Sequence, residues 1–550
     1  MRLQRNTRLI CTLSDRRPPD RDVFDEDVDS ADDGSDPLSQ VGSSESFPYI
    51  DSLYNAGMDV ARINLSHGTR AQHSACIEAV NRIRSVRGKE GELPCVSLGL
   101  MLDTRGPEVR VETFRHQAVV FRKGDCIRLV GCAPSSPQEV RCAPVEVLNK
   151  LQKGDAVFFQ DGLLVGSVIQ MEQEPSDTGS NQGRTCVIRV HKGSTLYSNK
   201  GMNVPSRPLG LPLLTQQDQE DLLWGGSQGM DIVALSFTRT GEDVCVMRRF
   251  LDEAGLTHVL IISKIESKES LCHLDSIVEE SDGIMLARGD LGVEIEAEKI
   301  PFFQKRIASL CRSRHKPFIV ATEIMESMIH NPRPTRAEVS DVANAIYDGA
   351  NALMLSAETA IGEYPAAVVR MTGQIVSTTE KTLSSLSIPF LPPPFTSCDF
   401  HSLKDDTQTV TKGDETPSPP CTQASCNEAH ATILSASIRG GVQQGAKALF
   451  LYVEDTDSMR TVFEHYFGAP ILVWTPSPRV QTQCAIGCGV TCFLGERCDS
   501  LETWRTKVMN LVEQGKFRGI LEEGDVVLVL GLWPSVSQIS TLGTLQLLRV

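Results

Sequence analysis

Short apolar runs that end in polar or small residues recur along the chain, and most of them precede a helix-like segment. We predict that eight of these runs are strands, at residues 8–13, 58–64, 98–103, 231–237, 258–264, 283–288, 317–322 and 352–356. Strands that alternate with helices form parallel sheets with right-handed crossovers, and eight such units can close into a barrel. The pattern therefore predicts an α/β protein built on a (β/α)8 TIM barrel.

The clearest predicted helix begins at Thr335, directly after Pro332 and Pro334. Thr335 and Glu338 have the spacing of a capping box, which satisfies the first amide groups of a helix. This helix should end near Gly349, just before the last predicted strand.

Two interruptions divide the chain into predicted domains. Residues 110–205 alternate apolar and polar positions after the third strand, which predicts a small all-β lid domain inserted in a barrel loop. Residues 385–426 are rich in Pro, Ser, Thr and Asp and cannot form a core, so we expect a linker. The barrel domain would then comprise residues 1–109 and 206–384, and a C-terminal α/β domain would comprise 427–550.

The C-terminal domain should contain a helix that starts at about Asn427. Apolar runs predict its strands at 448–453, 471–475, 526–532 and 546–550.

The segment 14–46, after the first predicted strand, is strongly acidic. Like charges at this density repel one another, which favours disorder. A calcium-binding loop is a less favoured alternative, because the EF-hand spacing and its final Glu are missing.

The chain has 550 residues, 41% of them hydrophobic, and a formal charge of −16. This size fits two or three domains, and the negative charge argues against binding to nucleic acid or a membrane surface. No apolar run is long enough to span a membrane, and the first predicted strand leaves no room for a secretory signal. We therefore expect a cytoplasmic protein.

The cysteines lack the paired C-x-x-C spacing of structural zinc sites. Four of them, Cys484, Cys488, Cys492 and Cys498, lie in one short stretch. Packing in a strand and its flanking loops is the favoured interpretation, and a metal site or a redox pair is the alternative.

Charged residues end two successive predicted strands. Lys264 and Glu266 close one, and Arg288 and Asp290 close the next. The carboxyl ends of barrel strands meet at one mouth, so two carboxylates and two cations should converge there. Their natural ligand is a metal-bound phosphorylated anion.

Two further predicted strands carry hard oxygen donors with a single formal charge, which suit a weakly held monovalent cation. These donors are Asn64, Ser66, Asp103 and Thr104. Arg62 and Arg110 are placed to clamp phosphate. Taken singly, each residue could instead cap a helix or form a surface ion pair, and the combination across several strand ends favours a site.

Several motifs occur in a fixed order. They are Asn64-Leu-Ser-His-Gly, Leu102-Asp-Thr-Arg-Gly-Pro-Glu-Val-Arg, Lys200-Gly-Met-Asn-Val-Pro, Ile262-Ser-Lys-Ile-Glu, Ala287-Arg-Gly-Asp-Leu-Gly, and Glu326-Ser-Met-Ile through Pro332-Arg-Pro-Thr-Arg-Ala-Glu to Asp348-Gly-Ala. With these motifs the chain resembles pyruvate kinase over nearly its whole length. The resemblance implies a barrel, a β lid and a C-terminal regulatory α/β domain.

The resemblance also implies substrates and roles. Glu266 and Asp290 would hold Mg²⁺ or Mn²⁺ between phosphoenolpyruvate and ADP or ATP, and Lys264 would stabilise charge on the phosphoryl group and the enolate. The substrate carboxylate would lie against Gly289, Asp290 and Thr322. Thr322, acting through water with Ser356 behind it, would help to protonate the enolate.

The nucleotide would contact Arg62, His67, Arg110 and Lys200 by the same resemblance, with Arg62 also on the substrate phosphate. Asp161 and Arg110 would hold the lid shut and so exclude water. Asn64, Ser66, Asp103 and Thr104 would bind K⁺, and Glu108 is similar to the potassium-using form of the family. A homotetramer is also implied.

The chain departs from the family pattern around the nucleotide. Leu13-Ser-Asp-Arg-Arg replaces Gly-Pro-Ala-Ser beside the base, and Gln72 stands where an aromatic residue is common. Other changes near the substrate are Glu323, Ala357 and Ile361.

The predicted regulatory domain also departs from the family. Glu454-Asp-Thr-Asp-Ser replaces a hydroxyl-rich loop, and its carboxylates would repel a sugar phosphate, so activation by fructose bisphosphate is not expected. Gly531-Leu-Trp-Pro resembles the effector-side loop.

Two functions remain in view. The first is an active glycolytic pyruvate kinase. The second is a catalytically impaired paralogue that binds phosphoenolpyruvate or regulates a partner. A metal-dependent lyase of another phosphoenolpyruvate-binding barrel family is a more distant alternative.

Overall fold

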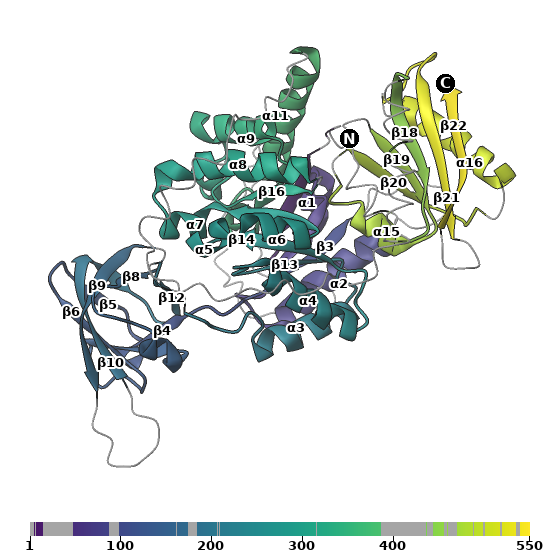
Figure 1. The fold of residues 1–550 in the computed structure, drawn as a ribbon. Coiled ribbons are helices and arrows are strands. Elements are labelled where there is room, and N and C mark those ends of the chain that lie inside the picture. Colours follow the sequence, from purple (N-terminus) through teal and green to yellow (C-terminus); the bar gives the residue numbers. More distant parts are fainter. Residues whose placement is uncertain are drawn as a thin grey trace, which may run out of the picture.

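A computed structural model describes residues 5, 7–14, 48–86, 98–160, 162–173, 184–205, 207, 209–314, 316–386, 436, 444–455, 459, 470–487, 489–498, 501–517, 520–534 and 540–550. In this part of the chain the strands form two closed barrels, a two-stranded sheet and a five-stranded sheet. The all-β barrel and the C-terminal sheet lie at opposite sides of the parallel barrel (Figure 1). Nearly all of the predicted acidic segment and of the linker falls outside the described residues.

The central barrel contains eight parallel strands. They are β1 (Arg8–Thr12), β2 (Val60–Asn64), β3 (Gly99–Asp103), β13 (Ile232–Leu235), β14 (Leu260–Ile265), β15 (Gly283–Ala287), β16 (Phe318–Ala321) and β17 (Ala352–Leu355). β1 pairs with both β2 and β17, which closes the sheet. The predicted strands and the predicted fold class are confirmed.

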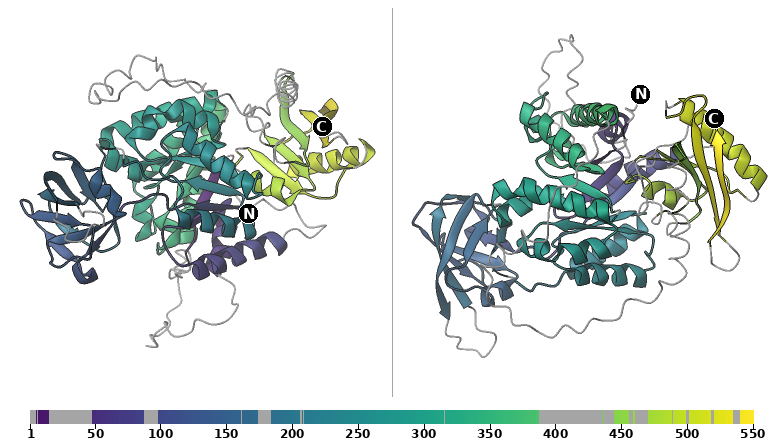
Figure 2. Two further views of the ribbon diagram at one scale, coloured as in Figure 1. Left: turned by 60° about the horizontal axis from the view of Figure 1, so that its bottom comes forward. Right: turned by 45° about the horizontal axis from the view of Figure 1, so that its top comes forward.

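Helices surround this barrel (Figure 2). They are α1 (Pro48–Ala56), α2 (Arg70–Val86), α3 (Gln216–Ser227), α4 (Gly241–Glu253), α5 (Lys268–Cys272), α6 (Leu274–Glu280), α7 (Arg288–Glu294), α8 (Ile300–Ser313), α9 (Arg336–Asp348), α10 (Ala357–Ala360) and α11 (Pro365–Leu386). The predicted capping box of α9 is present, because Thr335 and Glu338 exchange hydrogen bonds, and Gly349 ends the helix in the left-handed conformation. No helix in the described ranges is both long and apolar enough to cross a membrane.

The inserted β domain is a second closed barrel with its own buried core. Its strands are β4 (Arg110–Thr113), β6 (Cys126–Val130), β7 (Glu139–Ala143), β8 (Ala156–Phe159), β9 (Leu164–Gln173), β10 (Arg184–Lys192) and β12 (Lys200–Asn203). β5 (Val119–Phe121) and β11 (Ser194–Leu196) form a small separate sheet. Lys200 lies opposite Val111 in the β4–β12 pair, next to Arg110, so this pairing places two cations where the lid joins the barrel.

The C-terminal sheet has the order β20-β19-β18-β21-β22. Its elements are β18 (Ala446–Tyr452), β19 (Ile471–Thr475), α15 (Pro478–Gln483), β20 (Val490–Leu494), α16 (Leu501–Phe517), β21 (Val526–Pro534) and β22 (Ser540–Arg549). Sequence analysis missed β20. The strand predicted at 526–532 is two residues longer, because β21 pairs with β22 as far as Pro534, so the segment from Gly531 that resembles an effector-side loop is part of a strand. The predicted helix near Asn427 lies outside the described residues, and the exact domain boundaries stay a prediction.

The clustered cysteines pack in two different cores. Cys484 and Cys492 are buried in the core on one face of the C-terminal sheet, and Cys498 is buried with Trp504 on the other face. Within the described ranges, no three Cys, His, Asp or Glu side chains group as metal ligands. Cys488 lies outside the described residues. The arrangement supports packing as the role of the three described cysteines.

The C-terminal domain closes the bottom of the central barrel. Ala485 and Ile486 are fully buried among the side chains that fill the barrel interior. Arg8, at the start of β1, donates hydrogen bonds to the carbonyl oxygens of Gly487, at 3.1 Å, and Val490. The barrel and the C-terminal domain therefore share an apolar contact bordered by charge-assisted hydrogen bonds, at the end opposite the strand carboxyl termini.

Replacing Ile486 with alanine should lower the free energy of unfolding by about 2–5 kcal/mol, because it leaves a cavity at a fully buried site. Urea denaturation measures the change. The matched control is Met509→Ala in α16, whose side chain is 56% exposed and whose loss should cost less than about 0.5 kcal/mol. Equal midpoints for the two variants would contradict the buried contact.

Candidate active site

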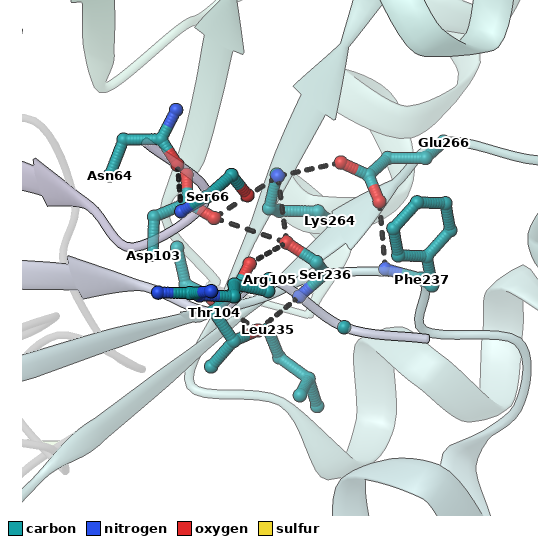
Figure 3. A network of polar contacts seen from close by, with 12 residues as sticks. Asn64, Ser66, Asp103, Thr104, Arg105, Leu235, Ser236, Phe237, Lys264 and Glu266 are labelled. Atoms are coloured by element: carbon teal, nitrogen blue, oxygen red, sulfur yellow. Dashed lines mark hydrogen bonds and ion pairs between the residues drawn. The ribbon is translucent and has the colours of Figure 1, made fainter. Parts of the chain in front are cut away.

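A buried lysine lies between two carboxylates at the carboxyl ends of the barrel strands. The Nζ atom of Lys264, in β14, is 2.7 Å from Glu266 Oε1 and 3.1 Å from Asp103 Oδ1. It also donates a hydrogen bond to Ser236 Oγ at 2.9 Å. Lys264, Asp103 and Glu266 are each less than a tenth exposed. Figure 3 shows the three side chains converging with Ser236.

Arg62 forms a second buried cation beside this lysine. Its Nε and Nη2 atoms bind Asp103 Oδ2 at 2.8 and 2.7 Å, and Nη1 donates to Thr12 Oγ1 at 2.7 Å. Both oxygens of Asp103 therefore face cations, Arg62 on one side and Lys264 on the other.

These contacts fix the charge state of the network. Burial by itself raises the pKa of Asp103, but Lys264 and Arg62 outweigh it and hold that pKa below its ordinary value. Burial likewise opposes the charged form of Lys264, yet Asp103, Glu266 and Asp290 raise the pKa of Lys264 above its ordinary value. Lys264 is thus a permanent cation at neutral pH, suited to stabilise negative charge on a ligand.

Backbone geometry positions Glu266. Its Oε2 atom accepts a hydrogen bond from the backbone amide of Phe237 at 2.7 Å. Phe237 has φ of 56°, a conformation that few residues other than glycine adopt. The ring of Phe237 lies against Gly106, where a Cβ atom would be only 2.6 Å from it. The loops after β13 and β3 therefore fit together only with glycine at position 106.

Sequence analysis missed Ser236 and Thr12. Ser236 Oγ lies 3.1 Å from Asp103 Oδ1 and 2.7 Å from the carbonyl oxygen of Thr104, so it connects Lys264 to the β3 loop. Both missed residues are polar, and each is the second-last residue of a predicted strand. Asp103 was identified because it is a polar residue near the end of a predicted strand. The same criterion could have identified Ser236 and Thr12.

The four oxygen donors proposed for a monovalent cation come from β2, β3 and the loops after them (Figure 3). Asn64 Oδ1 accepts a hydrogen bond from the Ser66 amide at 3.1 Å, which orients the side chain. Thr104 Oγ1 accepts one from the Ser236 amide at 3.0 Å. Among these donors only Asp103 is charged, and it already binds Arg62 and Lys264, so the set suits a weakly held cation rather than zinc.

The loop after β16 has a strained backbone, and hydrogen bonds from Gly289 and Arg288 hold it in place. Thr322 and Glu323 have φ values of 65° and 52°. Thr322 Oγ1 accepts a hydrogen bond from the Gly289 amide at 2.7 Å, at the start of α7. Arg288 donates to the carbonyl oxygens of Thr322 and Glu323 at 2.9 and 3.1 Å and pairs with Asp341 of α9. Arg288 therefore supports the loop, whereas the sequence suggested a cation facing the barrel mouth.

A fully buried carboxylate that sequence analysis missed joins this loop to the last strand. Glu358 accepts hydrogen bonds from the Met325 amide at 3.0 Å and from the Ser356 amide at 2.7 Å. The backbones that carry Thr322 and Ser356 are thereby tied together. Ala357, a departure from the family pattern, is the first residue of α10, and Ile361 is 56% exposed after it.

Cations from the lid and the barrel surround His67. Burial lowers the pKa of His67, and so do the charges of Arg110, Lys200, Arg62 and Arg105. Arg110 itself pairs with Glu108 at 2.6 Å. The site therefore presents a positive field that suits phosphate groups. Asp161, predicted to help close the lid, lies outside the described residues.

The carboxylates suit a magnesium site. Mg²⁺ usually binds one or two protein carboxylates and takes its other ligands from water and substrate phosphates. Glu266 directly follows β14, Asp290 is exposed in the first turn of α7, and both raise the pKa of Lys264. A site with only these two carboxylates agrees with the finding that no three His, Cys, Asp or Glu side chains group as metal ligands in the described ranges.

Fold and site together define a (β/α)8-barrel protein with buried cations, Lys264 and Arg62, at the mouth of the barrel. A family model described as "Pyruvate kinase, barrel domain" matches residues 4–369. The chain is 32% identical over 509 residues to a pyruvate kinase of Bacillus licheniformis, covering 92% of this chain and 78% of the relative. Pyruvate kinases of Clostridium acetobutylicum, 31% identical with 92% and 97% covered, and of Mycobacterium tuberculosis, 32% identical with 91% and 94% covered, are similarly close. The chain belongs to the pyruvate kinase family.

One half-buried carboxyl links the two segments that carry Glu266 and Asp290. Glu294 ends α7, and it accepts a hydrogen bond from the backbone amide of Lys268 at the start of α5. Burial raises the pKa of Glu294 from 4.5 to about 7, despite that hydrogen bond. The folded protein therefore holds a proton that the unfolded chain releases between these two values, and stability falls as pH rises through this range.

We expect Glu294→Gln to melt at a higher temperature than wild type at pH 8, with the difference shrinking at pH 5. The amide keeps the acceptor for Lys268 and removes the desolvated charge. Melting curves across this pH range measure the effect, and Glu298→Gln, at an exposed position nearby, is the control. A difference that did not depend on pH would contradict the raised pKa.

Proposed function

We propose that this protein is a glycolytic pyruvate kinase, which transfers the phosphoryl group of phosphoenolpyruvate to ADP and yields pyruvate and ATP. The observation that carries the proposal is the buried cation pair. Lys264 and Arg62 share Asp103, and Lys264 also lies 2.7 Å from Glu266 at the mouth of the barrel. Asp103, Lys264 and Glu266 lie in the motifs that the chain shares with the pyruvate kinase family, and Arg62 lies two positions before the Asn64 motif.

In the proposed reaction the bond between phosphorus and the enolate oxygen breaks, and a bond to a β-phosphate oxygen of ADP forms. Arg62 and Lys264 bind the phosphoryl oxygens, and Lys264 stabilises the charge that develops on the enolate. Glu266 and Asp290 would hold Mg²⁺ or Mn²⁺, which would supply positive charge to neutralise the phosphate groups.

The substrate carboxylate binds at the start of α7, near Gly289, Asp290 and Thr322. The enolate then takes a proton at its methylene carbon to become pyruvate. Thr322 supplies this proton through a water molecule, with Ser356 behind it. The strained backbone of Thr322, anchored by the Gly289 amide at 2.7 Å, supports this role because it holds the hydroxyl in one place.

On the nucleotide side, His67, Arg110 and Lys200 bind phosphate groups together with Arg62. Arg110 and Asp161 hold the lid over the site, so that water is excluded during transfer. Asn64, Ser66, Asp103 and Thr104 bind K⁺. We further propose a cytoplasmic homotetramer that fructose bisphosphate does not activate, because Glu454 and Asp455 carry negative charge where phosphate would bind.

The alternative is a catalytically impaired paralogue that binds phosphoenolpyruvate or acts as a regulator. One contact favours it. Gln72 Oε1 accepts a hydrogen bond from the Thr69 amide at 2.7 Å at the start of α2, so this side chain caps a helix. Gln72 stands where the family commonly has an aromatic residue on the nucleotide side. A helix-capping glutamine at this position would weaken the binding of ADP and leave the binding of phosphoenolpyruvate unchanged.

Pyruvate should form from phosphoenolpyruvate and ADP with Mg²⁺, and Lys264→Met should lower kcat by about 10²–10³-fold, because it removes the cation that stabilises transition-state charge. A coupled assay measures the rate. Lys299→Met, a lysine paired with Glu296 on the surface, is the matched control. Phosphoenolpyruvate binding by calorimetry without any turnover would reject the kinase and support the impaired paralogue.

The wild-type rate should rise when K⁺ replaces Na⁺, and Glu108→Lys should remove this dependence. The ammonium group of the introduced lysine would place a fixed positive charge in the loop after β3 and so replace the charge of the ion. Initial rates in matched K⁺ and Na⁺ salts measure the ratio for each protein. Equal wild-type rates in the two salts would contradict the potassium site, and they would leave the Lys264→Met result unaffected.

A further inference from the structure

A histidine of the barrel and an arginine of the C-terminal domain meet at the end of the barrel opposite the mouth. His258 lies two positions before β14, and Arg479 belongs to α15. The Nη1 atom of Arg479 lies 3.0 Å from His258 Nδ1. His258 is only 9% exposed, so its ring is largely removed from water.

The chemistry of the two groups fixes the protonation state of the imidazole. A guanidinium carries only hydrogen-bond donors and stays charged in proteins. His258 Nδ1 must therefore accept the hydrogen bond, which it can do only in the neutral ring that carries its proton on Nε2. A further hydrogen bond joins this ring to the backbone of Met230. Binding of Arg479 and protonation of His258 Nδ1 therefore exclude each other.

The charges that act on this imidazole, in the described part of the chain, come from both sides of the contact. Arg479 of α15 opposes its protonation, and Asp231, directly before β13, favours it. Asp231 is itself paired with Arg84 of α2, which offsets part of its negative charge. Burial and Arg479 together outweigh Asp231 and hold the pKa of His258 below its ordinary value of 6.5.

The barrel side of the contact is held by the sheet. Asp231 Oδ2 accepts a hydrogen bond from the Leu100 amide of β3 at 2.8 Å. The amide of Leu260, two positions after His258, donates to the carbonyl oxygen of Asp231 at 3.0 Å. Arg479, in contrast, is a long side chain on a helix of six residues. Repulsion between His258 and Arg479 must therefore be relieved on the side of α15.

We propose that His258 and Arg479 form a proton-sensitive contact between the barrel and the C-terminal domain. At neutral pH His258 accepts the hydrogen bond and holds α15 against the barrel. In acid the imidazole takes a proton at Nδ1, the hydrogen bond breaks, and two cations face each other. The apolar contact of Ala485 and Ile486 with the barrel interior is left in place, so α15 loosens without release of the whole domain.

The effect on stability has a definite sign. Below pH 6.5 the unfolded chain binds a proton at His258 that the folded chain resists, so the free energy of unfolding falls as the pH drops below this value. Glu294 acts with the opposite sign, because its buried charge destabilises the fold as the pH rises. Melting of the whole protein would combine the two effects, and a local measurement separates them.

Amide hydrogen exchange of residues 478–487 measures the contact locally. The protection of this segment, corrected for the intrinsic pH dependence of exchange, should fall in the wild-type chain between pH 7.5 and pH 5. The expected fall is about three- to tenfold, which corresponds to the loss of one partly exposed hydrogen bond. Unchanged protection down to pH 5 would overturn the proposal.

His258→Asn keeps an acceptor close to the position of Nδ1 but cannot take up a proton. Its protection should differ by less than about twofold between the two pH values, because no group at position 258 titrates. The matched control is His273→Asn, at an exposed position of the same barrel, which should show the wild-type fall. An equal fall in His258→Asn and in wild type would assign the pH dependence to another group and overturn the proposal.

Arg479→Met tests the partner at an exposed position of α15, where the substitution leaves the core intact. Loss of the guanidinium should lower the protection at pH 7.5 to that of the acidified wild-type chain, and acidification should then add little. Retention of the full wild-type pH dependence in this variant overturns the role of Arg479. Exchange is measured without substrates, so these outcomes do not depend on whether the protein is an active pyruvate kinase.

Discussion

The buried charge of Lys264 constrains the rest of the site. A cation removed from water needs nearby negative charge, and here Asp103 and Glu266 supply it at 3.1 and 2.7 Å. Removing one partner from such a network typically costs about 3–5 kcal/mol, because the other charge remains buried and unpaired. Arg62 lies on the far side of Asp103 and depends on the same carboxylate. The positions of β2, β3 and β14 are therefore coupled to the chemistry at the mouth.

The barrel supplies the rigidity that this network requires. Its strands are parallel and closed, so their carboxyl ends present side chains from distant parts of the sequence at one rim. Two buried carboxylates outside the charge network hold the loops at that rim. Glu358 accepts hydrogen bonds from the backbone amides of Met325 and Ser356, which follow β16 and β17. Asp218 accepts one from the backbone amide of Arg105, which follows β3. At the opposite end Ile486 fills the barrel interior. The rim that carries the candidate site is thus supported by contacts outside the charge network of Lys264.

Sequence reasoning succeeded where a local pattern carries the information. Alternating strand and helix segments, the Thr335 capping box and charged residues at strand ends are visible over a few residues. It failed where a role depends on distant partners. The sequence predicts that Arg288 is a cation of the site. In the structure it pairs with Asp341, more than fifty positions later in the chain, and donates a hydrogen bond to the carbonyl oxygen of Thr322. Gln72 likewise reads as a nucleotide-side residue, and its hydrogen bond to Thr69 is a contact of the folded helix start.

The sequence by itself determined the fold class, the family and the set of candidate residues, because hydrophobic periodicity and short motifs are properties of neighbouring positions. Only the tertiary structure decided which candidates meet. It paired Lys264 with Asp103, more than 150 positions away, brought Ser236 between them, and set Arg479 of the C-terminal domain on His258. Such contacts depend on barrel closure and loop geometry, and the strength of each charge depends on burial and on partners that no local pattern contains.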